Sequence, residues 1–210
     1  MDLSSPISSV VPSAHGAVLA VLARTDQPLS GRQVAALTNG RVGQWRANEV
    51  LVQLAEAGIV LREHRPPAKL HRLNHEHVAA AGIIALAGQR EELFSRMRAH
   101  AAAWSPAPQA LWLFGSAARG DGGSGSDVDL LAVRPEPVDA DDPAWLAQVD
   151  DLSTKVSVWS GNSCEVLELS AAELTQMTAQ GERLIDELRA DGVLIAGSSP
   201  RALLRLTVTR

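Results

Sequence analysis

The chain has 210 residues and a mass of 22.2 kDa, with 46% apolar residues, 20% charged residues and a formal net charge of −5. This composition is ordinary for a soluble globular protein and excludes wholesale disorder, and no run of about 18 uncharged apolar residues could span a membrane. The single cysteine, Cys164, excludes an internal disulfide. We therefore expect one or two compact domains in the cytoplasm, with neither a signal peptide nor a membrane partner.

The charge is distributed unevenly along the chain. Residues 1–75 contain eight Lys and Arg against five Asp and Glu, a net charge of +3, whereas residues 76–210 carry a net charge of −8. A mildly basic front part and an acidic remainder indicate two parts with different partners. The basic part is a candidate for a surface that binds a polyanion.

The first 75 residues have the pattern of three short helices followed by two short strands, after a loose start of a dozen residues. Ser30 is a candidate N-cap for the second helix, and Gly58 ends the third. A turn around Pro66 joins the two strands. The predicted elements are helices over 13–24, 31–37 and 44–56 and strands over 59–63 and 69–73.

This order of elements resembles the winged helix-turn-helix domains of bacterial transcription regulators. The resemblance implies that the third helix enters the major groove of DNA, where Arg suits guanine and Gln and Asn suit adenine, while the strand pair contacts phosphates. An alternative is a dimerisation or substrate-docking module with an ordinary solvated face. The candidate DNA-binding residues are Arg41, Gln44, Arg46 and Asn48 on the helix and Arg62, Arg65, Lys69 and Arg72 in the strand pair.

Residues 76–106 form a predicted helical linker that is rich in alanine and apolar along one broad side. The helix is expected to run from Glu76 to Trp104 and to end at the prolines that follow, Pro106 and Pro108. It either pairs with its copy in a homodimer or packs on its own domain. The sequence leaves both arrangements open.

The segment after the linker carries the clearest chemical motif. A short apolar strand over 111–114 runs into Gly115 and Ser116, and after a Gly- and Ser-rich loop Asp127 and Asp129 open a second apolar strand. A glycine lets the backbone approach a phosphate closely, and a helix start favours anions. Carboxylates two residues apart on a strand share one face, where they suit Mg²⁺. The alternative is a surface loop with two solubilising acidic residues.

The stretch GSAARGDGGSGSDVDLLAV resembles the DNA polymerase beta-like nucleotidyltransferase superfamily, in particular its minimal bacterial members. The resemblance implies that Asp127 and Asp129 hold Mg²⁺, and that an NTP, expected to be ATP, is the substrate. The resemblance also assigns the triphosphate to the turn and the loop. The NTP-binding candidates are Gly115, Ser116, Arg119 and Ser126, and Gly120 and Leu130 complete the match.

A third carboxylate is expected on a later strand, over 163–169. Glu165 fits the position best, as a metal ligand or as the base that takes the acceptor proton, and Glu168 on the opposite face is the second candidate. The family usually has Asp there, so Glu departs from its pattern. An ordinary half-exposed strand acid is the alternative.

Two other groups of reactive side chains fit no site. His71, His75 and His77 lie close together, but no cysteine or carboxylate completes a zinc pattern. Cys164 lies in an apolar strand, which indicates packing and not nucleophilic chemistry.

The sequence therefore predicts an α+β protein in which a winged helix-turn-helix domain is joined by a helical linker to a small mixed-sheet nucleotidyltransferase domain. We expect a Mg²⁺-dependent enzyme with an unidentified hydroxyl acceptor. The alternative is a DNA-binding regulator or antitoxin whose catalytic fold is a nucleotide sensor or a relic. Antibiotic modification is a third hypothesis, although no winged helix is expected there. The predicted parts are 1–75, 76–106, 107–198 and a C-terminal tail over 199–210.

Predicted partners are an NTP, DNA, a protein acceptor or partner toxin, and a second copy of the chain. The toxin partner is implied by resemblance, because some minimal nucleotidyltransferases adenylylate partner toxins. The homodimer is expected because winged-helix proteins often bind paired half-sites.

Overall fold

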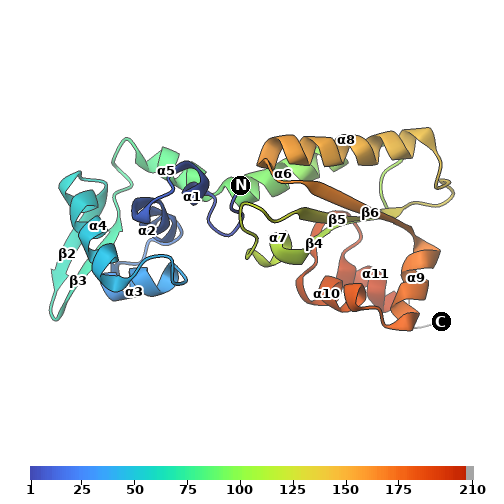
Figure 1. Cartoon of the computed structure of the whole chain (residues 1–210). Coiled ribbons are helices and arrows are strands. Elements are labelled where there is room, and N and C mark those ends of the chain that lie inside the picture. Colours follow the sequence, from blue (N-terminus) through green and yellow to red (C-terminus); the bar gives the residue numbers. More distant parts are fainter. Residues whose placement is uncertain (207–210) are drawn as a thin grey trace. The chain divides into compact units, whose positions relative to one another are not determined.

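The computed structural model describes residues 1–206, which form helices and two separate sheets (Figure 1). The predicted α+β class is confirmed. The chain divides into two compact units: the N-terminal unit comprises Asp2 and Ser4–Arg90, and the C-terminal unit comprises Met1, Leu3 and the residues from Glu91 onward. None of the helices within residues 1–206 combines the length and the apolar character that a membrane crossing requires.

The N-terminal unit contains helices and a small antiparallel sheet with the strand order β1-β3-β2. Helices and strands lie nearly where the residue pattern predicts them. Two short elements were not predicted: β1 pairs with β3, and α1 lies in the part expected to be loose. The elements are α1 (Ile7–Val10), α2 (Ala14–Leu22), β1 (Leu29–Ser30), α3 (Gly31–Leu37), α4 (Gln44–Glu56), β2 (Val60–Arg65), β3 (Ala68–Leu73) and α5 (Ala80–Ala87).

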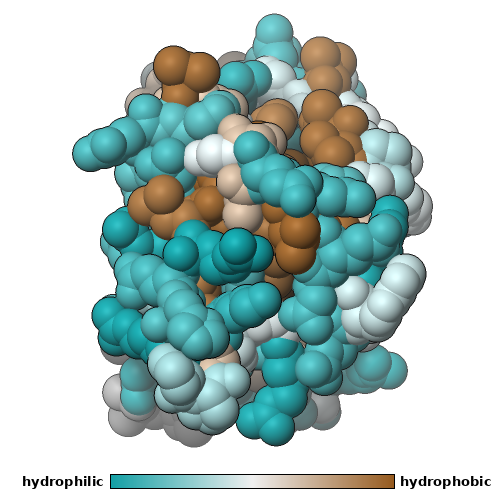
Figure 2. Space-filling view, turned by 90° about the vertical axis from the view of Figure 1, so that its left-hand side faces the viewer, coloured by the Kyte–Doolittle hydropathy of each residue, from teal (hydrophilic) through white to brown (hydrophobic). Residues whose placement is uncertain are grey.

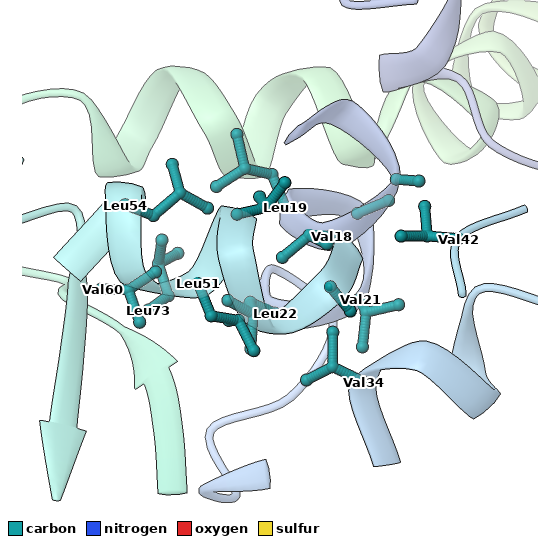
Figure 3. Packing of buried hydrophobic residues seen from close by; sticks show 14 of the residues in the cluster. Val18, Leu19, Val21, Leu22, Val34, Val42, Leu51, Leu54, Val60 and Leu73 are labelled. Atoms are coloured by element: carbon teal, nitrogen blue, oxygen red, sulfur yellow. The ribbon is translucent and has the colours of Figure 1, made fainter. Parts of the chain in front are cut away.

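Local signals and a single apolar core explain these elements. The Ser30 hydroxyl accepts a hydrogen bond from the Gln33 backbone N–H, and the Gln33 side chain accepts one from the Ser30 backbone, so a capping box starts α3. Side chains of α2, α3 and α4 pack with Val60 of β2 and Leu73 of β3 in this core, where Val18 and Leu51 are fully buried (Figure 3).

The linker segment differs from the single helix expected over 76–104. It forms two helices, α5 and α6 (Gln89–Ala101), separated at Gly88, which caps the end of α5. Ile83 of α5 belongs to the core of the N-terminal unit, whereas Leu93 and Met97 of α6 belong to the C-terminal unit. The division between the compact units therefore falls inside the segment assigned to a linker. The functional domain limits inferred from the sequence remain predictions.

The C-terminal unit is built on a mixed sheet with the strand order β6-β5-β4-β7. Strands β5 and β6 are parallel and are joined by the crossover helix α8, while β4 is antiparallel to both β5 and β7. Its elements after α6 are β4 (Ala110–Phe114), α7 (Gly115–Arg119), β5 (Val128–Arg134), α8 (Pro143–Ser160), β6 (Cys164–Ser170), α9 (Ala171–Gln180), α10 (Arg183–Asp191), β7 (Val193–Gly197) and α11 (Pro200–Leu206).

Helices cover both faces of this sheet (Figure 1). Leu130 and Ala132 of β5 face the core shared with α6 and α8, whereas Leu131 and Val133 face the core shared with α9, α10 and α11. Because side chains alternate along a strand, Asp129 lies on the α10 side of the sheet. Part of the predicted C-terminal tail is the helix α11, and residues 207–210 lie outside the described residues.

Candidate active site

Three of the predicted carboxylates gather at the start of β5 and β6. Asp127 is exposed and immediately precedes β5, and Asp129 is the second residue of that strand. In the parallel ladder Asp129 lies in register with Glu165 of β6, and across the antiparallel ladder it lies opposite Phe114, the last residue of β4. The end of β4, which leads into the glycine–serine turn, therefore lies beside the starts of β5 and β6, which carry the acidic residues.

The register separates the two glutamates of β6. Glu168 lies in register with Ala132, three residues further along the ladder, and its carboxylate accepts a hydrogen bond from the Arg134 guanidinium. Glu168 is thus paired with Arg134, the last residue of β5. Of the two candidates for the third carboxylate, Glu165 is the one that lies beside Asp129.

The electrostatics of Asp129 reflect this gathering of acidic groups. Burial raises the pKa of the Asp129 carboxyl, and the charges of Asp127, Glu165 and Glu187 raise it further, in that order. A partly buried carboxylate with three other carboxylates acting on it is in a position that a cation would stabilise.

Glu187 was not predicted as a site residue. It lies on α10, whose residues Ile185 and Leu188 pack into the core on the same side of the sheet as Asp129. Along the sequence Glu187 looks like a surface acid, because it forms an ion pair of 2.8 Å with Arg183 four residues earlier. Only the docking of α10 on the sheet brings it toward Asp129.

Gly115 is where the turn and the carboxylates meet most closely. Its φ of +69° lies in the left-handed region, and a Cβ added there would stand 2.4 Å from Oδ2 of Asp129. Only glycine combines this backbone conformation with such a close approach. The start of α7 is thereby packed directly on the Asp129 carboxylate.

The loop after α7 is organised by two serines. The Ser116 carbonyl oxygen accepts hydrogen bonds from the backbone N–H groups of Gly120, Asp121 and Gly122 at 3.0–3.2 Å. The Ser126 hydroxyl accepts one from the Gly123 N–H at 3.0 Å. Ser126, predicted to bind the nucleotide, therefore directs its hydroxyl into the loop.

Arg119 lies exposed at the rim of this group of residues. Its Nε donates to Oδ2 of Asp121 at 3.2 Å, and its Nη1 lies 3.9 Å from Oδ2 of Asp191. The hydrogen bond with Asp121 is the largest cause of the raised pKa of Arg119. The pKa of Asp129 is raised overall, and the Arg119 charge is the contribution that opposes this rise.

Residues 99–183 match the family model described as "Nucleotidyltransferase domain". This match assigns a nucleotidyltransferase domain to residues 99–183 of the C-terminal unit. The matched span includes the turn at Gly115, both aspartates and Glu165, and it ends before Glu187. No curated protein matches the chain.

Two solved structures are similar to the chain. One is described as a toxin-antitoxin with AMP-PNP; the TM-score is 0.35 at 15% identity, and the match covers 57% of this chain and 84% of that chain. The other is a mutant of the toxin-antitoxin MntA-HpeT, with a TM-score of 0.40 at 14% identity, over 55% of this chain and 84% of that chain. The family match, and not these similarities, identifies the domain.

The nucleotidyltransferase domain presents donors that suit a hard divalent cation. The groups around Asp129 are carboxylates, the ligands that Mg²⁺ prefers. Within residues 1–206 no three His, Cys, Asp or Glu side chains already enclose a metal position. Burial is the largest cause of the raised pKa of Asp129, and the charges of Asp127 and Glu165 add to it; a cation would offset their repulsion.

The other reactive side chains have separate environments. Burial raises the pKa of the Cys164 thiol to about 12, which keeps it protonated. His75 lies 3.1 Å from Asp26, and Nδ1 of His77 accepts a hydrogen bond from the Ala79 N–H. His71 is buried in the sheet. The three histidines therefore have three different local environments.

The predicted DNA-binding residues all belong to the N-terminal unit. Gln44 is exposed at the start of α4, and the neighbouring Trp45, which was not predicted, is 76% exposed. Arg46 forms an ion pair of 2.6 Å with Glu49. The Asn48 amide lies against the backbone of Gly31 in α3, because a Cβ added to Gly31 would overlap it. Asn48 thus contacts a neighbouring helix.

The remaining basic candidates do not share one surface. Strand register places Arg62 and Lys69 on one face of the β2–β3 pair and Arg65 on the other, where it forms an ion pair of 3.1 Å with Glu63. Arg41 forms an ion pair of 3.2 Å with Asp2. Figure 2 shows a largely hydrophilic face of this unit, interrupted by separate hydrophobic patches.

Proposed function

We propose that the nucleotidyltransferase domain transfers a nucleoside monophosphate from an NTP to a hydroxyl acceptor, with Mg²⁺ as cofactor and ATP as the expected donor. The acceptor oxygen forms a bond to the α-phosphorus, the bond from that phosphorus to the bridging oxygen breaks, and pyrophosphate leaves. One observation carries the proposal: Gly115 packs on the Asp129 carboxylate, and Asp129 lies in register with Glu165 of the neighbouring strand. It supports a phosphate-binding turn beside a cation-binding group of carboxylates.

Each residue has a proposed task. The backbone at Gly115 and Ser116 approaches the triphosphate, and Asp127 and Asp129 hold the metal. Bound Mg²⁺ offsets the negative charge of the triphosphate and of the departing pyrophosphate. Glu165 either ligates the metal or accepts the proton of the acceptor hydroxyl. Arg119 offsets phosphate charge from the rim.

Transfer from labelled NTPs tests this function. The protein is incubated with each of the four NTPs, Mg²⁺ and candidate acceptors, and incorporation is compared with that of Asp127→Ala. Asp150→Ala is the matched control, because Asp150 is an exposed acid of α8 outside the site. We expect Asp127→Ala to lose at least about 100-fold in rate and Asp150→Ala to match wild type. No turnover and no binding of Mg-NTP by the wild type would reject the proposal.

A tyrosine acceptor would have to belong to a partner. The chain contains no Tyr, so any self-modification must fall on Ser, Thr or another group. We propose a partner protein, such as a partner toxin, as one class of acceptor. Intact mass measured with Mg-ATP, with and without the product of the neighbouring gene, distinguishes self-modification from modification of that partner.

We further propose that the N-terminal unit is a winged helix that binds DNA as a homodimer. Three helices followed by an antiparallel strand pair support it, as does the exposed start of α4 with Gln44 and Arg46. The alternative of a regulator with an inactive nucleotidyltransferase fold rests on the same surface. Binding of duplex DNA at several salt concentrations tests the proposal.

The DNA experiment has a matched control. Arg46→Ala removes one positive charge from the start of α4 and Lys69→Ala removes one from β3, both proposed DNA contacts, whereas Arg183→Ala removes one from the other unit, where Arg183 is 92% exposed. We expect weaker binding only for the first two. Binding unaffected by all three, or no binding by wild type, would contradict the proposal.

A further inference from the structure

Asn162 is one of five buried polar or charged residues within residues 1–204, the part of the chain whose burial is described, and neither the sequence motif nor the carboxylates account for it. Its side chain is 4% exposed. It follows Gly161, which ends α8 with a φ of +72°, and it precedes β6 by two residues. A buried amide without partners would be costly, so its contacts show what it does.

The Asn162 amide contacts the loop that leads to the aspartates. Its Nδ2 donates a hydrogen bond of 2.8 Å to the Ser126 carbonyl oxygen, 36 residues earlier in the chain. Because a carbonyl oxygen only accepts, the amide must present Nδ2 there. Its Oδ1 accepts from the Met1 ammonium at 2.6 Å, so both ends of the amide are satisfied.

The backbone of Asn162 is fixed as well. Its N–H donates to the Ser160 hydroxyl at 3.1 Å, and that hydroxyl donates to the Val156 carbonyl oxygen at 2.7 Å, inside the last turns of α8. The turn is therefore anchored to a helix of the core. A side chain held this way fixes the loop that precedes Asp127 relative to the end of α8.

A second bond from the same turn completes the contact. The Ser163 carbonyl oxygen accepts a hydrogen bond of 2.8 Å from the Val128 N–H. Ser126 and Val128 are the two neighbours of Asp127, so the backbone is held on both sides of this exposed aspartate. Asp127 itself precedes the first register pair of the β5–β6 ladder, Val128 with Cys164.

We propose that Asn162 is a positioning residue that holds Asp127 in place for metal binding, an inference that rests on the proposed function. The loop before Asp127 contains four glycines between residues 120 and 125, so the unbound backbone would sample many conformations. The bond to Ser126 restricts that sampling. Loss of a residue that orients a metal ligand commonly lowers metal affinity by about 10–100-fold.

Two variants remove the donor. Asn162→Asp keeps the size of the side chain and Asn162→Ala removes the amide altogether. Asn74→Ala is the matched control, because Asn74 also donates from Nδ2 to a backbone carbonyl, that of Gly58 at 2.9 Å, but in the N-terminal unit. All three lose one such bond, and only the first two lose it beside Asp127.

Mn²⁺ affinity in the presence of a non-hydrolysable ATP analogue, measured by electron paramagnetic resonance, is the first readout. We expect both Asn162 variants to bind Mn²⁺ about 10-fold more weakly than wild type and to need more Mg²⁺ for half-maximal transfer, with Asn74→Ala unchanged. Wild-type Mn²⁺ affinity in both Asn162 variants would overturn the proposal. If Asn162→Ala does not fold, Asn162→Asp decides.

Hydrogen exchange separates this inference from the proposed function. We expect the amides of residues 121–129 to exchange about 10-fold faster in the Asn162 variants, and unchanged exchange there would overturn the positioning role. Absence of Mn²⁺ and nucleotide binding by wild type would reject the proposed function alone. In that case, faster exchange at residues 121–129 in the Asn162 variants would still support the proposal that Asn162 positions Asp127. Unchanged exchange there would still reject that proposal.

Discussion

At the scale of single residues, Gly115 carries the tightest steric constraint of the site. Its φ of +69° is left-handed, and a Cβ added there would stand only 2.4 Å from Oδ2 of Asp129, so alanine must strain the backbone and displace the carboxylate. We expect Gly115→Ala to lower kcat/KM for transfer about 100-fold and the free energy of unfolding by about 1–2 kcal/mol. Transfer assays and urea denaturation measure the two effects.

Gly123 provides the control for this prediction. No atom lies within 4 Å of a Cβ added to Gly123, and its φ is not in the left-handed region. Gly123→Ala should therefore keep wild-type activity and stability. Equal losses in both variants would mean that loop flexibility, and not the approach to Asp129, limits the reaction.

His71 makes the stability of the N-terminal unit depend on pH. Burial lowers its pKa, and Arg62 of β2 and Lys69 of β3 lower it further, against a hydrogen bond with the Leu29 backbone that raises it. Its Nδ1 is buried without a hydrogen-bond partner among the described residues. Since the folded state favours the neutral ring, stability is complete above the unfolded pKa of about 6.5 and falls as pH drops below it toward the folded pKa.

This dependence is measured by urea unfolding between about pH 5 and pH 8, followed by circular dichroism. We expect a positive slope of the unfolding free energy with pH below about 6.5 in wild type and a flatter curve for His71→Gln. If the unfolding free energy depended on pH equally in both proteins, a group other than His71 would cause the dependence.

At the scale of elements, the start of α3 depends on its capping box. The Ser30 hydroxyl satisfies the Gln33 N–H, and loss of such a cap costs about 1 kcal/mol. We expect Ser30→Ala to lower the free energy of unfolding by that amount in urea denaturation. Ser95→Ala, at an exposed position inside α6, is the control and should leave stability unchanged or raise it slightly, because alanine favours a helix more than serine does. If Ser95→Ala lowered the free energy of unfolding by a similar amount, loss of the cap could not explain the effect of Ser30→Ala.

Signals that act within one element could be predicted, and contacts that depend on docking could not. The Ser30 cap is visible in the sequence because it acts over three residues, and the placement of Glu165 beside Asp129 follows from strand alternation. Glu187 and Asn162 reach the site only because α10 packs on the sheet and α8 ends where it does. The break at Gly88 likewise follows from α5 and α6 packing into different cores.

At the scale of the whole molecule, the proposed activities fall on different compact units. The carboxylates and the glycine–serine turn belong to the C-terminal unit, and every proposed DNA contact belongs to the N-terminal unit. We therefore expect the activities to be separable by mutation. Asp127→Ala should abolish transfer and keep the wild-type Kd for DNA, and Arg46→Ala with Lys69→Ala should weaken DNA binding and keep transfer.

The salt dependence of DNA binding sharpens this prediction. Each phosphate contact that is lost lowers the slope of log K against log salt by about 0.9, so a variant that loses two contacts should lower it by about 1.8. For Arg46→Ala alone, a change in Kd without a change in slope would assign Arg46 to base contacts, since only phosphate contacts release counterions. If Mg-ATP changed the Kd of wild type but not of Asp127→Ala, the units would be coupled. That result would favour the alternative in which the nucleotidyltransferase domain senses nucleotide for a DNA-binding regulator.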